Sequence, residues 1–108
     1  MINVIINRQN SQIEQFELTG HASSGPYGYD LVCAGVSAVS FGTVNAVMAL
    51  SDAEPEIEQG DEGGYLRVTI PYGISDVTME KVQLLLEGML VSLKTIEQEY
   101  SEFITIQE

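Results

Sequence analysis

A long run of apolar, mostly small residues over positions 33–50 constrains the fold more than any other feature of this sequence. Glycine, alanine and serine recur along the run, and such a helix can pack closely against a sheet. Gly35 and Gly42 each weaken a helix by about 1 kcal/mol relative to alanine, so we expect close packing to compensate. Polar residues interrupt the run, and we therefore expect no membrane-spanning segment. They are Ser37, Ser40, Thr43 and Asn45.

The rest of the chain alternates between short segments rich in β-branched residues and turns, and it contains a second helical pattern. Over 75–100, apolar residues recur at steps of three and four, with Ser75 or Asp76 as the cap. The strands come in hairpins, which predicts an α+β fold of two layers, a mostly antiparallel sheet with two helices, in the order β-β-α-β-β-α-β. The predicted strands cover 2–8, 13–19, 54–59, 65–70 and 103–106, with a hairpin turn at 60–64.

The length of 108 residues corresponds to a single domain over 1–108, and the formal net charge is −12. Four scattered cations make no basic surface, so we expect no direct contact with nucleic acid. A basic protein or peptide partner suits this charge better, although acidity can also serve solubility alone. One cysteine cannot form an internal disulfide, and the N-terminus lacks a signal-peptide pattern. We therefore expect a cytoplasmic protein.

The only histidine and the only cysteine, His21 and Cys33, lie twelve positions apart. Between them is a glycine-rich loop over 22–30, which we expect to be exposed, mobile and able to gate access of a substrate. Asp30 precedes the apolar run as a helix N-cap would, which places Cys33 in the first helical turn. The candidate gating residues are Ala22, Ser23, Ser24, Gly25, Pro26, Tyr27, Gly28 and Tyr29.

A base, a thiol and a helix N-terminus within one short segment are the components of a cysteine nucleophile. In this hypothesis His21 takes the thiol proton, Cys33 attacks a carbonyl carbon, and the protonated His21 gives its proton to the leaving amine. Backbone N–H groups of Cys33 and Ala34 could form the oxyanion hole. Asp30 either orients His21 or only caps the helix. The candidate site-lining residues are Gly20, Ala34 and Ser37.

Each of these residues also has an ordinary structural interpretation. A lone cysteine such as Cys33 is more often a small buried hydrophobe, and His21 is more often an unremarkable residue at a strand end. Ser37 lies one turn after Cys33 on the same helix face, which close packing explains equally well. A zinc site would need more than one histidine and one cysteine, so we expect neither a metal nor another cofactor.

The combined pattern around His21 and Cys33 resembles the signature of a bacterial family, the ribosomal-processing cysteine protease Prp. The length, the acidity and the order of elements also match that family over the whole chain. Two departures are mild, since Gly35 stands where alanine is usual and Val39 where leucine is common. The matching residues are Gly20-His21-Ala22, Gly28, Asp30, Val32-Cys33-Ala34 and Val36-Ser37-Ala38.

The resemblance implies a cysteine endopeptidase whose catalytic pair is His21 and Cys33. It implies that the substrate is the twenty-seventh protein of the large ribosomal subunit, a basic protein, from which the enzyme removes an N-terminal extension. It also implies a homodimer, and a loop over 22–30 that becomes ordered when the peptide binds.

A non-catalytic acidic module that binds or assembles a basic ribosomal protein is the second hypothesis. It predicts tight, salt-sensitive binding that survives Cys33→Ala and His21→Ala. The protease hypothesis predicts that Cys33→Ala abolishes cleavage without unfolding the protein. It also predicts that iodoacetamide alkylates Cys33 rapidly near neutral pH, and far more slowly in His21→Ala.

Overall fold

The computed structural model describes residues 1–20, 28–60 and 64–108, and for 28–30 it describes the backbone only. Within these residues the elements follow the predicted order β-β-α-β-β-α-β, which confirms the α+β fold. The elements are β1 (Ile2–Gln9), β2 (Gln12–Thr19), α1 (Gly28–Ser51), β3 (Glu56–Gln59), β4 (Tyr65–Thr69), α2 (Asp76–Glu99) and β5 (Ile104–Gln107).

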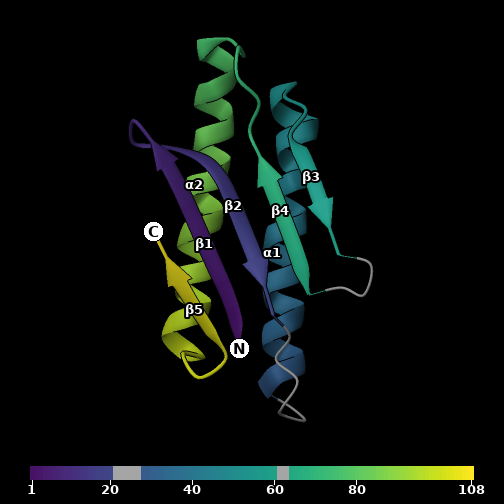
Figure 1. Ribbon diagram of the computed structural model, residues 1–108, viewed down its shortest axis with the longest axis vertical. Coiled ribbons are helices and arrows are strands. Elements are labelled where there is room, and N and C mark those ends of the chain that lie inside the picture. The colour runs from purple at the N-terminus through teal and green to yellow at the C-terminus, as the bar shows by residue number, and fades with distance from the viewer. Residues whose placement is uncertain (21–27, 61–63) are drawn as a thin grey trace.

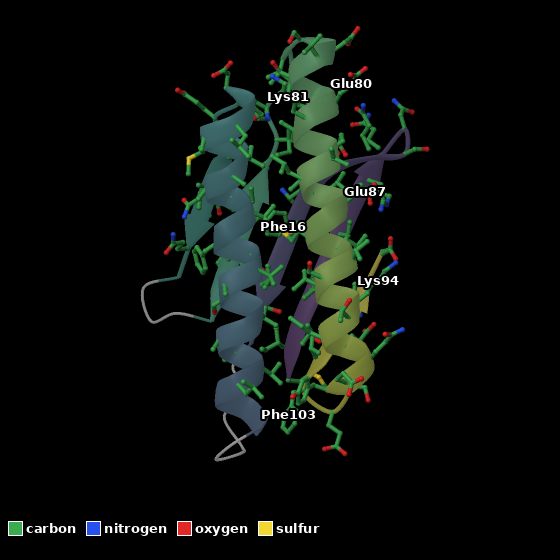
Figure 2. The ribbon with its side chains drawn as sticks, turned by 180° about the vertical axis from the view of Figure 1, so that it is seen from behind. Phe16, Glu80, Lys81, Glu87, Lys94 and Phe103 are labelled. Atoms are coloured by element: carbon green, nitrogen blue, oxygen red, sulfur yellow. The ribbon has the colours of Figure 1, made fainter. Side chains whose placement is uncertain are left out.

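The strands form one sheet in the order β3-β4-β2-β1-β5. The pairs β1–β2, β2–β4 and β3–β4 are antiparallel, and β5 joins β1 in parallel at the opposite edge from β3. Figure 1 shows both helices behind the sheet, and Figure 2, from the other side, shows them next to each other in front of it. The molecule is therefore two layers, with a core between one face of the sheet and the inner faces of α1 and α2.

Alternation in β1 and β2 supplies the sheet side of this core. Ile2, Val4 and Ile6 are buried on β1, as a period of two requires. On β2 the alternation breaks between Ile13 and Phe16, because the pairing with β1 shifts register there. This β-bulge adds one residue, and the next core side chain still reaches the inner face. Phe16 is only 1% exposed and lies between the sheet and the helices (Figure 2).

The second helix begins as the sequence predicts. Ser75 is the N-cap of α2, and its hydroxyl accepts a hydrogen bond from the backbone N–H of Thr78 at 3.2 Å. Ser75 is therefore the cap rather than Asp76. Asp76 occupies the first turn, where its carboxylate interacts favourably with the positive end of the helix dipole.

The first helix begins earlier than predicted. It starts at Gly28, five residues before the predicted start of the apolar run at 33, so the last three residues of the predicted loop over 22–30 belong to α1. Asp30 lies inside the first turn and does not precede the helix, and the prediction that it occupies the N-cap position is wrong. Residues 22–27 of that loop lie outside the described residues.

The two central glycines of α1 differ in how closely α2 approaches them. A Cβ atom added to Gly35 would lie 3.6 Å from Cδ1 of Ile96 on α2, whereas one added to Gly42 would meet nothing within 4 Å. The distance of 3.6 Å is an ordinary van der Waals contact, so Gly35 lies close to α2 but the packing would also accept an alanine there. The packing seen in this chain does not require a glycine at 42.

By length and composition, the segment Leu31–Ser51 of α1 could cross a membrane, which the sequence analysis did not expect. The core helix of a folded domain satisfies the same criteria, and this helix does contribute a buried stripe. Val32, Val36, Val44 and Val47 are each at most 4% exposed and belong to the core. Core packing therefore explains part of the apolar character of α1, since only 28% of its most apolar stretch is buried.

Candidate functional site

A cavity of about 220 Å³ lies between α1 and the strand ends that surround its first half. One wall is α1, and the other combines the start of β1, the end of β2 and the hairpin of β3 and β4. From α1 it is lined by Cys33, Val36, Ser37, Ser40 and Phe41; from β1 and β2 by Ile2, Leu18 and Gly20; and from the hairpin by Gln59, Gly60, Gly64, Tyr65 and Leu66.

Helical periodicity explains which side chains of α1 reach the cavity. Cys33, Val36, Ser37 and Ser40 are spaced at i, i+3, i+4 and i+7, so they form a single stripe along the helix. Cys33 is a free cysteine, half-buried at the N-terminal end of this stripe. Its thiol therefore borders a concave, mainly apolar space, which is the form that small-molecule and peptide sites commonly take.

The structure places the predicted site residues unequally. Gly20 and Ser37 line the same cavity as Cys33. Ala34 is exposed and is not among the described residues that line it. His21 and the gating residues over 22–27 lie outside the described residues, and of Gly28, Tyr29 and Asp30 only the backbone, in the first turn of α1, is described. The roles assigned to these residues stay predictions.

The longer α1 changes one part of the predicted chemistry. Cys33 is the sixth residue of the helix, in its second turn. The N–H groups of Cys33 and Ala34 therefore point to the carbonyls of Tyr29 and Asp30, four residues earlier. Only the first four N–H groups of a helix are free, so these two cannot form an oxyanion hole, and that expectation is wrong. The dipole argument, which holds within the first turn, does not extend to Cys33 either.

Gly20 joins the end of β2 to the β3–β4 hairpin. Its N–H donates a hydrogen bond to the carbonyl of Gly64 at 2.9 Å, and its φ of +100° lies in the left-handed region. A Cβ atom at this position would run into the carbonyl oxygen of Met1. Glycine is therefore the residue that fits here, and it places the chain at the cavity directly before His21.

The contribution of the β3–β4 hairpin to the cavity was not apparent from the sequence. Gln59, Gly60, Tyr65 and Leu66 come from a segment that was predicted only as an edge hairpin, and they meet α1 because β4 pairs with β2. Ser40 was interpreted only as a polar residue of the packed helix, and Phe41, which follows it, was given no role. Their spacing of seven and eight residues from Cys33 was the available signal for a shared face.

The cavity carries no charged side chain among the described residues that line it. The groups with shifted pKa values lie elsewhere. The Arg8 guanidinium, for example, hydrogen-bonds the Glu87 carboxylate and lowers its pKa, on the far side of α2. In the described part of the chain, no group of three or more His, Cys, Asp or Glu side chains gathers as a metal site would require.

The chain is similar to known proteases over nearly its whole length. A sequence model of a family described as cysteine protease Prp matches residues 1–105. The ribosomal processing cysteine protease Prp of Bacillus subtilis is 46% identical over 107 residues, which are 98% of this chain and 96% of that protein.

Two crystal structures of the ribosomal processing protease Prp from S. aureus have the same fold. The first, with a substrate peptide, has a TM-score of 0.86 at 41% identity and covers 99% of this chain and 98% of its own. The second, with a covalently linked product peptide, has a TM-score of 0.86 at 42% identity and the same coverage. A non-catalytic binding module is therefore the wrong one of the two hypotheses, and this chain belongs to the cysteine protease Prp family.

Proposed function

We propose that this cysteine protease processes a ribosomal protein, removing the N-terminal extension of the twenty-seventh protein of the large ribosomal subunit with a dyad of His21 and Cys33. One observation carries the proposal. The thiol of Cys33 borders a cavity that Gly20 also lines, and His21 follows Gly20 directly in the chain. The name of the Bacillus subtilis relative supports ribosomal processing.

The reaction transfers the acyl group of the scissile peptide bond twice, first to the Cys33 sulfur and then to water. His21 accepts the proton of the Cys33 thiol, and the sulfur attacks the carbonyl carbon to form a tetrahedral intermediate. The C–N bond then breaks, the amine leaves with the proton from His21, and an acyl-enzyme thioester remains. A water molecule, deprotonated by His21, hydrolyses the thioester and restores the thiol. Peptide covalently linked to the S. aureus enzyme is consistent with this route.

Charge supports a basic substrate. The chain has 16 acidic and 4 basic side chains, and opposite net charge accelerates diffusional encounter. The described walls of the cavity are neutral. The charge therefore acts on approach and orientation of the precursor, and the residues that fill the cavity are selected by its uncharged walls, through shape, apolar contact and hydrogen bonds.

We also propose that the enzyme is a cytoplasmic homodimer. A single free cysteine suits a reducing compartment. Large apolar side chains are exposed on both helices, among them Met48 and Leu50 on α1 and Leu84 and Val91 on α2, and exposed apolar surface can mark an interface. Light scattering on the purified protein should give twice the mass of 11.8 kDa; a monomer at every concentration tested would contradict the dimer.

The proposed function is tested by intact mass spectrometry of the precursor ribosomal protein after incubation with the enzyme. The wild-type enzyme should remove one defined N-terminal peptide, and Cys33→Ala and His21→Ala should leave the precursor intact. Asn45→Ala is the matched control, because Asn45 is exposed on the same helix and is not among the cavity residues. It should cleave as the wild type does.

Two results would contradict the proposal. Cleavage by Cys33→Ala would show that Cys33 is not the nucleophile. An intact precursor after incubation with active wild-type enzyme would show that this precursor is not the substrate. Alkylation by iodoacetamide then tests the dyad separately from the substrate. Cys33 should react rapidly near neutral pH in the wild type and at least about tenfold more slowly in His21→Ala.

A further inference from the structure

Ser40 is a buried serine whose hydroxyl has no hydrogen-bond partner among the described residues. The residue is 0% exposed, and it lines the cavity two turns along α1 from Cys33. Buried polar groups in native proteins nearly always have a partner, and an exception calls for an explanation.

Other hydroxyls of the same helix show what Ser40 does not do. Thr43 donates to the carbonyl of Val39 at 2.7 Å. Ser51 is as buried as Ser40, but it donates to the carbonyl of Val47 at 2.5 Å and accepts from the N–H of Ala53 at 3.2 Å. Bonding to the carbonyl four residues earlier is the usual solution for a hydroxyl in a helix. Ser40 has the same backbone geometry available and makes no such bond.

An unpaired buried hydroxyl destabilises the unliganded enzyme relative to an apolar side chain of similar size. The penalty is removed if the partner arrives with a ligand. Ser40 is among the residues that line the cavity, beside the buried apolar residues Val36 and Leu66. Its hydroxyl oxygen has almost no accessible surface in the unliganded chain, so a ligand group reaches it as the cavity walls adjust around the ligand. The hydroxyl is thus an unpaired polar group between apolar neighbours in the wall of the cavity.

The position of Ser40 fixes which part of a peptide it can meet. Seven residues of α-helix separate it from Cys33, which is about 10 Å at a rise of 1.5 Å per residue. An extended peptide advances about 3.3 Å per residue. For a peptide extended along α1, Ser40 therefore lies about three residues away from the scissile bond. Because Ser40 is buried, it is reached by the tip of a side chain rather than by the peptide backbone.

We infer that Ser40 is a specificity-determining residue, whose hydroxyl hydrogen-bonds the polar tip of a substrate side chain about three residues from the scissile bond. The side chain that fits has an apolar stem against the cavity walls and a hydroxyl or amide at its end. This inference rests on the proposed peptidase function, and it concerns selection of the substrate rather than the reacting atoms.

The test is a set of synthetic peptides around the cleavage site of the precursor, with paired residues at the second to fourth positions on either side. Each pair has similar size and differs in its polar tip, as Gln and Met or Thr and Val do. For the wild type we expect one position at which the polar member is cleaved with a kcat/KM about 3- to 10-fold higher. In Ser40→Ala that ratio should fall to about 1, with the melting temperature unchanged or raised.

Ser51→Ala is the matched control, since it removes a buried and paired hydroxyl from the same helix. It should lower the melting temperature and keep the wild-type preference. Equal ratios in the wild type and Ser40→Ala would overturn this inference but not the proposed function. A lower melting temperature of Ser40→Ala with an unchanged preference would do the same. Failure of the wild type to cleave the parent peptide would overturn the proposed function and this inference with it.

Discussion

Replacing Gly20 by alanine should destabilise the protein more than any other single methyl group added to a glycine described in the structure. The φ of Gly20 is +100°, and an L-residue in the left-handed region costs about 1–2 kcal/mol. The new Cβ would also meet the carbonyl oxygen of Met1 far inside contact distance. That oxygen cannot easily withdraw. The N–H of Ile2, in the same planar peptide, donates to the carbonyl of Phe103 at 2.8 Å.

The two terms give the expected magnitude. Forcing an extra methyl into a filled position costs about 1–3 kcal/mol, so the sum for Gly20→Ala is about 2–5 kcal/mol. A domain of this size is stable by about 5–15 kcal/mol. The variant should therefore fold, with a clearly lower urea midpoint. Its kcat/KM should fall as well, because Gly20 lines the cavity.

Two other glycines allow the cost of the left-handed backbone conformation to be measured apart from the cost of the steric clash. Gly73 has a φ of +80° but open space around its Cβ position, and Gly88 lies in the interior of α2 with nothing within 4 Å. Gly73→Ala should cost only the backbone term, about 1–2 kcal/mol, and Gly88→Ala should stabilise by about 0.5–1 kcal/mol. Urea unfolding followed by circular dichroism measures all three. A Gly20→Ala variant no less stable than Gly73→Ala would refute the steric argument.

Three further predictions concern the scaffold. Gln83 accepts from the N–H of Ile13 at 2.7 Å and donates to its carbonyl at 2.9 Å, so Gln83→Ala should lower the free energy of unfolding by about 1–3 kcal/mol; an unchanged urea midpoint would contradict this. Ser75→Ala removes the cap of α2 and should cost about 0.5–2 kcal/mol by the same measurement, whereas Ser75→Asp should not. Arg8 lowers the pKa of Glu87 below its ordinary 4.5, so the pair stabilises the fold fully above about pH 4.5 and loses that contribution as the pH falls through the lowered value. Because the pair is largely exposed, Arg8→Gln should cost only about 0.5 kcal/mol at pH 7 and nothing at pH 2; an equal loss at both pH values would contradict the ionic origin.

Local signals in the sequence were sufficient for most elements. Alternating β-branched residues predicted β1 and β2 to within a residue at most ends, and Ser75 was one of the two caps proposed for α2. These features depend on interactions between residues close in sequence, which periodicity and capping preferences describe well. The parallel pairing of β5 with β1 was not visible, because it joins residues about a hundred positions apart.

The start of α1 shows where local signals compete. Gly28 and Tyr29 directly follow a segment that contains Gly25 and Pro26, and Asp30 resembles a cap, so the sequence favoured a later start. In the fold the helix continues through Asp30 towards its N-terminus. A carboxylate in the first turn still interacts favourably with the positive end of the helix dipole. The same residue therefore suits both the N-cap position and the first turn.

The sequence by itself determined the chemistry available to this protein and the elements that present it. One thiol lies near the start of an apolar helix, one histidine follows a strand, and a motif around them matches a protease family. The tertiary structure decided what surrounds the thiol. Only the pairing of β4 with β2 brings Tyr65 and Leu66 opposite Ser37 and Ser40 to enclose the cavity. The physical reason is that secondary structure depends on neighbours along the chain, whereas a cavity is formed by residues far apart in sequence that folding brings together.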